Sequence, residues 1–124
     1  DEKDNTARLI RAMENPHVTC LGHPTGRLLL EREPYPVNLA KVLEVAAETG
    51  TWIELNCNPW RLDLDWRWWH RARDLGVLCC LNPDAHQTGH LRFLDLGVTV
   101  ARKGWLRAKD VLNTRTLAQL KKLL

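Results

Sequence analysis

The sequence predicts a single α/β domain with three parallel strands, outer helices and a helical C-terminal tail. Segments with helical periodicity alternate with short apolar runs along residues 4–81, and the connections between them are short. A polar loop follows each apolar run directly. Alternating helices and strands with short connections are typical of parallel β/α units, whose right-handed crossovers put the helices on one face of a curled sheet. Three strands are too few to close a barrel.

The first β/α unit begins with a helix expected over residues 4–14. Cap oxygens in residues 4–6 precede an apolar face that contains Leu9 and Met13. Asn15-Pro16 ends this helix, and the apolar run 18–22 is the first expected strand.

The next two helices carry clearer end signals. One is expected over 38–50, from a cap at Asn38 to Gly50, and it leads into a strand over 51–55. The other is expected over 63–76, with Asp63 or Asp65 as its cap and Gly76 at its end.

The last expected strand, 77–81, is apolar throughout and is expected to be buried on both faces. Residues 90–124 then predict short helices separated at Gly97, Gly104 and Asn113-Thr114.

Composition excludes some classes of protein and leaves others open. The chain has 124 residues, 44% of them hydrophobic and 27% charged, which is usual for a folded globular domain rather than a disordered one. No apolar run approaches the roughly 20 residues that cross a bilayer, so no membrane partner is expected. A net charge of +3 permits a polyanionic partner without requiring one.

The four cysteines are expected to be reduced thiols in a cytoplasmic protein. They are Cys20, Cys57, Cys79 and Cys80, and no C-x-x-C pair occurs among them. Most lie in apolar runs, where free cysteine packs as a small hydrophobic residue. Ligation of a metal by thiolates is the alternative.

The polar loops give the first functional signal. HPTGR follows the first strand, NCNPWR the second and NPDAH the third. The carboxyl ends of parallel strands meet at one edge of the sheet, and active sites assemble there. The loops at the opposite edge are short and plain.

Asp84 and His86 are the strongest metal-ligand candidates. A spacing of two residues in extended chain puts both side chains on one side, and a carboxylate with an imidazole is a common ligand pair for Zn²⁺, Mn²⁺ or Fe²⁺. His23, at the same edge, is a candidate third ligand. The alternative is that these residues serve only their own loops.

Four further rim residues are candidates for substrate binding. Arg27 and Arg61 are suited to gripping phosphate oxygens, and a structural salt bridge is the alternative for both. Asn56 and Asn58 alternate in direction, so at most one faces the site, and either is able to bond the loop backbone. Glu54, in the strand before them, is expected to be a structural carboxylate.

Aromatic and histidine residues elsewhere are expected to be mostly structural. Trp66 and Trp69 share a helix face from which Trp68 turns away, and packing is favoured there over stacking on bases. His90 is a weaker site candidate because it lies close in sequence to the D-x-H string.

Four strings, taken together and in order, resemble one family. They are GHPTGRLLL at 22–30, IELNCNPWRLDLDW at 53–66, LNPDAH at 81–86 and LGVTVARKGWLRAKDVLNT at 96–114. The set resembles the C-terminal half of the PHP (polymerase and histidinol phosphatase) domain, as found in bacterial and archaeal family X DNA polymerases. The resemblance covers nearly all of residues 1–124.

The resemblance implies a fold and an activity. The fold is a partial, distorted seven-stranded β/α barrel, and the activity is a metal-dependent phosphoesterase that acts as a 3′–5′ exonuclease on DNA 3′ ends. Mn²⁺ or Zn²⁺, or else Fe²⁺, would activate a water molecule and clamp the phosphate oxygens. By the resemblance, His23, Asp84 and His86 are metal ligands.

The sequence also departs from the family pattern. The chain has no H-x-H string and no counterpart of the first two PHP motifs. It also begins at Asp1 rather than Met. We therefore expect about half of a PHP domain, without the polymerase core, that is inactive alone. The alternatives are a non-catalytic remnant that oligomerises through an exposed sheet edge, and a PHP-type phosphatase of small molecules such as histidinol phosphate.

Overall fold

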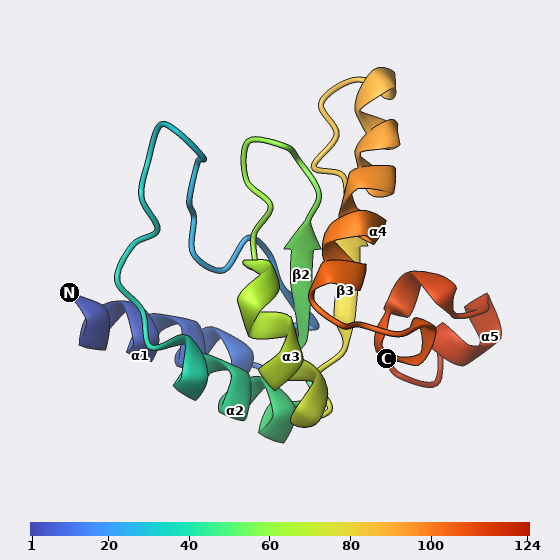
Figure 1. The fold of residues 1–124 in the computed structure, drawn as a ribbon. Coiled ribbons are helices and arrows are strands. Elements are labelled where there is room, and N and C mark those ends of the chain that lie inside the picture. The colour runs from blue at the N-terminus through green and yellow to red at the C-terminus, as the bar shows by residue number, and fades with distance from the viewer.

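A computed structural model describes all residues 1–124, and it contains a three-stranded sheet with helices packed against it (Figure 1). The elements are, in chain order, α1 (Glu2–Met13), β1 (Cys20–Leu21), α2 (Leu39–Thr49), β2 (Trp52–Asn56), α3 (Trp66–Asp74), β3 (Cys79–Asn82), η1 (Thr88–Arg92), α4 (Phe93–Lys103), η2 (Ala108–Asp110), η3 (Leu112–Thr114) and α5 (Leu117–Leu120). None of the helices combines the length and the apolar character of a membrane span.

The predicted parallel sheet is confirmed. Its strands run in the order β1-β2-β3, with Leu21 opposite Ile53 and Glu54 opposite Cys80. The sheet is open, so the barrel to which it would belong stays a prediction. Burial of β3 alternates instead of extending to both faces, because Cys79 and Leu81 face the core while Cys80 and Asn82 are half-buried.

The start of the first helix differs from the sequence prediction. Asp1 caps α1, where its side chain accepts a hydrogen bond from the backbone N–H of Asp4 at 2.8 Å. Thr6, one of the three expected caps, is instead buried inside the helix, and its hydroxyl accepts from the N–H of Asn38 at 2.9 Å. That contact ties α1 to the start of α2.

The ends of α2 and α3 follow the sequence prediction closely. Asn38 caps α2 by accepting from the N–H of Lys41, and Gly50 ends it with a left-handed φ of 73°. Asp65, rather than Asp63, caps α3. Gly76 follows α3 with a φ of 79°, a conformation that costs glycine little.

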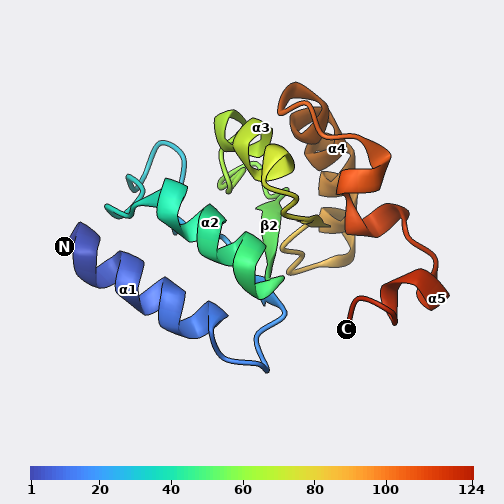
Figure 2. The ribbon, with the colours of Figure 1, turned by 90° about the horizontal axis from the view of Figure 1, so that it is seen from below.

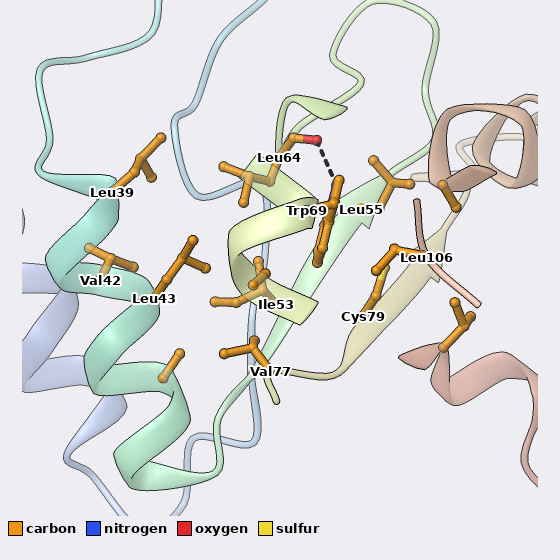
Figure 3. Packing of buried hydrophobic residues seen from close by; sticks show 14 of the residues in the cluster. Leu39, Val42, Leu43, Ile53, Leu55, Leu64, Trp69, Val77, Cys79 and Leu106 are labelled. Carbon is orange, nitrogen blue, oxygen red and sulfur yellow. Dashed lines mark hydrogen bonds between the residues drawn. The ribbon is translucent and has the colours of Figure 1, made fainter. Parts of the chain in front are cut away.

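The core lies between the sheet and helices α2, α3 and α4, which pack along one side of the strands (Figure 2). Ile53, Leu55 and Cys79 project from the sheet into this layer and are fully buried (Figure 3). Trp69 of α3 packs against them, and its indole N–H donates to the carbonyl of Leu64 at 3.2 Å. Burying an aromatic side chain of this size contributes about 3 kcal/mol.

The tryptophans of α3 have separate roles. Trp69 is fully buried, Trp68 is half-buried against the core, and Trp66 is exposed with the Lys103 ammonium 4.6 Å from its ring centroid. Trp69 is therefore a core residue, and Trp68 packs against the core with part of its side chain.

The tail forms short helices, as expected, and it covers the outer edge of β3. Val111 bridges to Cys79 in parallel. The Asn113 side chain donates to the carbonyl of Leu81 at 2.9 Å and accepts from its N–H at 2.8 Å, as a neighbouring strand would. β1 is the other edge strand of the sheet, with β2 as its one neighbour.

The prediction that Gly97 separates two helices is wrong, because Gly97 lies inside α4 and is buried. Its role is close approach: a Cβ at this position would lie 2.0 Å from Sγ and 2.9 Å from Cβ of Cys57, which follows β2. Cys57 is itself fully buried, so it has no space into which to move. Gly97 therefore sets how closely α4 packs against the end of β2.

Gly97→Ala is expected to destabilise the fold by about 2 kcal/mol in urea-induced unfolding. Overpacking against Cys57 outweighs the gain of about 1 kcal/mol in helix propensity. Gly89→Ala is the matched control, because a Cβ there meets nothing within 4 Å. Equal stability of the two variants would contradict the close packing.

Candidate functional site

Three loops leave the same edge of the sheet, as the sequence predicted. They span residues 22–38 after β1, 57–65 after β2 and 83–87 after β3, and all three emerge at the arrowhead end of β2 (Figure 1). We call these segments the rim loops. They carry most of the candidate site residues, and the hydrogen bonds described below connect them to one another.

Glu54 of β2 joins the strand ends beneath the rim loops. Its carboxylate accepts from the backbone N–H of His23 at 2.5 Å and from the Nδ2 amides of Asn82 at 2.9 Å and Asn56 at 3.4 Å. The side chain is only 8% exposed. A buried carboxylate needs such donors to offset its loss of solvation, so Glu54 has the structural role expected for it.

Asn56 lies in β2 and not in the loop after it. It is the last residue of that strand and is almost fully buried. Its Oδ1 accepts from the N–H of Asn58, and Oδ1 of Asn58 accepts in turn from the N–H of Trp60. Both amide side chains therefore shape the second rim loop, and a contact of either with substrate stays a prediction.

Asp63 is a second buried carboxylate, and it connects the first two rim loops. It is fully buried, and its Oδ2 accepts from the N–H of Thr25 at 3.0 Å. Burial raises the pKa of Asp63, and the hydrogen bonds from Thr25 counteract part of that rise. The sequence suggested Asp63 only as a helix cap.

Arg27 is held within the protein at every nitrogen of its guanidinium. Nε donates to the carbonyl of Arg61 at 2.8 Å, Nη2 donates to the carbonyl of Leu62, and Nη1 pairs with Asp65 at 2.8 Å. Partial burial raises the pKa of Asp65, but hydrogen bonds from Arg67 and Arg27 outweigh burial and hold that pKa well below its usual range. The alternative of a structural salt bridge thus describes what Arg27 does in the structure.

Arg61 connects the second and third rim loops. Its Nε donates to Oδ2 of Asp84 at 3.2 Å, and its Nη1 donates to the carbonyl of Arg27 at 3.4 Å. The ion pair is three-quarters or more buried on both sides. Nη2 of Arg61 makes no hydrogen bond within the chain, so part of this guanidinium is available to a phosphate.

Asp84 and His86 lie close together, but not through the extended chain that their spacing assumed, because Asp84 has a left-handed φ of 51°. Nδ1 of the His86 ring is 2.7 Å from the carbonyl oxygen of Asp84 and 3.9 Å from its Oδ1. His90 supports the same loop, because its Nδ1 accepts from the N–H of His86 and its ring stacks on Phe93 at 4.8 Å between centroids. Nε2 of His86 and Oδ1 of Asp84 make no hydrogen bond within the chain.

His23 does not join Asp84 and His86. No three side chains of His, Cys, Asp or Glu in the chain are gathered as a metal site requires. The chain therefore offers a pair of adjacent donors at one rim loop and a separate imidazole at another. Its residues alone do not fit a complete metal centre, which normally has four or more ligands.

Backbone strain concentrates in the rim loops. Five residues other than glycine have positive φ, and four of them lie here: His23 (26°), Leu30 (66°), Leu62 (46°) and Asp84 (51°). Such conformations cost about 1–3 kcal/mol each and persist where surrounding contacts impose them, most often at functional sites. This concentration of positive φ values favours the rim loops as the functional site.

Two neighbouring thiols lie on the same face of the sheet as Glu54. Cys20 of β1 and Cys80 of β3 are half-buried, and all four cysteines are free. A hydrogen bond from the Cys20 thiol lowers the pKa of Cys80 to about 7, and the same bond raises the pKa of Cys20. Burial raises the pKa of Cys57 to about 12.

The chain is similar to a DNA polymerase/exonuclease and to several proteins named as probable phosphatases. It is 43% identical over 117 residues to the DNA polymerase/3′-5′ exonuclease PolX of Bacillus subtilis, across 94% of this chain and 20% of that protein. It is 28% identical over 120 residues to a protein named "probable phosphatase" from Thermoanaerobacter sp., across 92% of this chain and 46% of that protein. No family model matches the chain.

The matched proteins are considerably longer than this chain. The 124 residues span about a fifth of PolX and just under half of the Thermoanaerobacter protein. A Caldanaerobacter subterraneus protein, also named "probable phosphatase", is 41% identical over 56 residues, or 45% of this chain. The names of these relatives agree with the kind of chemistry that the resemblance implied.

Arg27→Ala is expected to lower the free energy of unfolding by about 2 kcal/mol, because it removes charged hydrogen bonds to two buried carbonyls and a carboxylate. Arg67→Ala is the matched control: Arg67 pairs with the same Asp65 at 2.8 Å but is 71% exposed, so its loss should change stability much less than the loss of Arg27. Urea titrations of both variants provide the measurement. Unchanged stability in Arg27→Ala would leave phosphate binding as its main role.

Iodoacetamide is expected to alkylate Cys80 first, with a rate that rises through a midpoint near pH 7, because the thiolate is the reactive form. In Cys20→Ala the midpoint should move up toward about 9, the ordinary value, because the stabilising donor is gone. Mass spectrometry of peptides identifies the modified residue, and Cys57 serves as the unreactive internal control. An unshifted midpoint in the variant would refute the thiol pair.

Proposed function

We propose that the chain is a segment of a PHP-type phosphoesterase that processes DNA 3′ ends as part of a longer protein. The observation that carries this proposal is the 43% identity to PolX, which extends over 94% of the chain and is therefore not confined to one motif. The convergence of three polar loops at the carboxyl edge of a parallel sheet supports it, since active sites in β/α folds assemble there. The proposal places the protein in the cytoplasm, where thiols stay reduced.

The contacts within the rim loops suggest a separate role for each residue of the proposed site. Arg61 holds Oδ2 of Asp84, and the Asp84 carbonyl fixes the ring of His86, so both potential ligands are oriented before anything binds. Such supporting contacts are what metal-ligating side chains normally have. The unused Nη2 of Arg61 lies beside this pair and is suited to a phosphate oxygen.

The metal centre of such an enzyme would need ligands from outside this chain. Asp84 and His86 supply two donors and His23 supplies one more at a distance, which falls short of a complete site for Mn²⁺, Zn²⁺ or Fe²⁺. The greater length of the relatives supports the view that further ligands come from other segments of the intact protein. We therefore propose that the 124 residues alone bind metal weakly and do not turn over substrate.

Two alternatives have support of their own. A phosphatase of small molecules is suggested by the relatives that carry that name, although the longest such match has the lower identity of 28%. A non-catalytic, oligomerising role is suggested by the edge at β1, where no neighbouring strand covers the backbone. The second alternative predicts concentration-dependent dimers in sedimentation velocity together with no metal binding.

His86→Ala and Asp84→Asn are each expected to weaken Mn²⁺ or Zn²⁺ binding to the chain at least about tenfold in calorimetric titrations, because each removes one of two adjacent donors. His17→Ala is the control, since His17 is an exposed histidine between α1 and β1, away from the rim loops. Far-UV circular dichroism of all variants should match that of the unaltered chain.

Equal metal affinity in the variants and the unaltered chain would contradict the ligand assignment. EDTA-sensitive shortening of a 3′-labelled oligonucleotide by the isolated chain would contradict the incomplete site, because it would show that these residues suffice for hydrolysis.

A further inference from the structure

Trp60 is the most exposed large aromatic side chain of the rim loops. It is 61% exposed, whereas the α3 tryptophan Trp69 is fully buried. Leu30, at the tip of the first rim loop, is fully exposed as well. The two loop tips are joined, because the N–H of Leu29 donates to the carbonyl of Trp60 at 2.6 Å. Two exposed apolar residues therefore lie on loop tips that this hydrogen bond joins.

The backbone that carries Trp60 is fixed on every side. Oδ1 of Asn58 accepts from the N–H of Trp60 at 3.0 Å, and the carbonyl of Asn58 accepts from the N–H groups of Arg61 at 2.8 Å and Leu62 at 3.0 Å. Pro59 restricts the turn further by fixing its own φ. All these contacts use backbone atoms or Asn58, so the indole is displayed by a rigid turn without contributing to it.

A rigid, exposed indole is suited to binding by stacking. An aromatic side chain on a preorganised turn loses little conformational entropy when a flat ligand covers it. Every nucleobase has such a flat face, and proteins that hold single-stranded DNA combine aromatic platforms with positive charge along the backbone path. Arg61 follows Trp60 directly and has one nitrogen without a partner in the chain, so both elements are present at one place.

We propose that Trp60 is the base-stacking platform of the site, and that it positions the terminal region of a single DNA strand beside Arg61 and Asp84. This assignment rests on the proposed function and adds to it the part of the substrate that is recognised: the base as well as the phosphate.

The small apolar area of Trp60 and Leu30, and the charge beside Trp60, favour a base over a protein partner. One indole and one leucine provide far less than the roughly 800 Å² per partner that a stable protein interface buries. The neighbouring side chain Arg61 is cationic and the chain has a net charge of +3, which suits a polyanion. A single-stranded nucleic acid meets both conditions.

The test compares two labelled oligonucleotides of equal length and charge in fluorescence anisotropy titrations at low salt. One is oligo(dT), and the other carries abasic sites in place of its bases. The 124-residue chain is expected to bind oligo(dT) at least about fivefold more tightly, since stacking contributes about 1–3 kcal/mol per base. Trp60→Ala should abolish that preference, and Trp60→Phe should keep part of it.

Trp105→Ala is the matched control. Trp105 is 68% exposed, like Trp60, but it lies after α4 beside His70 of α3 and outside the rim loops. Its loss should leave the preference for oligo(dT) unchanged. An equal preference in Trp60→Ala and Trp105→Ala would overturn the proposal, as would equal binding of both oligonucleotides, or no binding of either, by the unaltered chain.

The same measurements separate this proposal from the proposed function. A base preference that depends on Trp60 in a chain whose metal binding ignores Asp84 and His86 would support stacking and reject the phosphoesterase site. Metal binding that depends on those two residues, without any base preference, would support the phosphoesterase site and reject stacking.

Discussion

The carboxylate of Glu54 is the interaction on which the site depends most. Backbone hydrogen bonds pair the three parallel strands, up to Asn56 opposite Asn82 for β2 and β3, but the loops that leave the strand ends need further contacts to fix their starts. Glu54, on the central strand, does so by accepting from the His23 N–H beyond β1 and from Asn82 at the end of β3. Because these donors lie on both flanking segments, one buried side chain links the starts of the first and third rim loops to the central strand.

Hydrogen bonds from charged side chains, rather than apolar packing, connect the rim loops to one another. Arg27 ties the second loop to the first through carbonyl oxygens, and Arg61 ties the third loop to the second through Asp84. Asp63 accepts a hydrogen bond from the backbone N–H of Thr25 and so holds the first loop to the second. Loops held in this way tolerate the positive φ values of Asp84 and Leu30, since the cost of each is met by several surrounding hydrogen bonds.

This architecture separates what is rigid from what is available for binding. Arg27 and Glu54 are engaged by contacts inside the protein, whereas Nε2 of His86, Nη2 of Arg61 and the indole of Trp60 are not. The unused groups lie on or next to the strained loops. In the roles proposed for them, these groups would bind a metal ion, a phosphate oxygen and a base, which are the parts of a nucleotide end.

The sequence by itself determined the parallel sheet, the Asn38 cap of α2 and the shared edge of the three loops. These features depend on local signals: apolar runs, cap residues and left-handed glycines. Tertiary structure alone decided that Gly97 lies inside a helix, that Asn56 ends a strand and that Arg27 is bound at every nitrogen. It also decided that His23 stays apart from the other two donors and that Trp60 remains exposed. Each of these outcomes depends on contacts between segments far apart in the chain, such as α4 with Cys57 or Arg27 with Asp65, and local sequence carries no information about such distances.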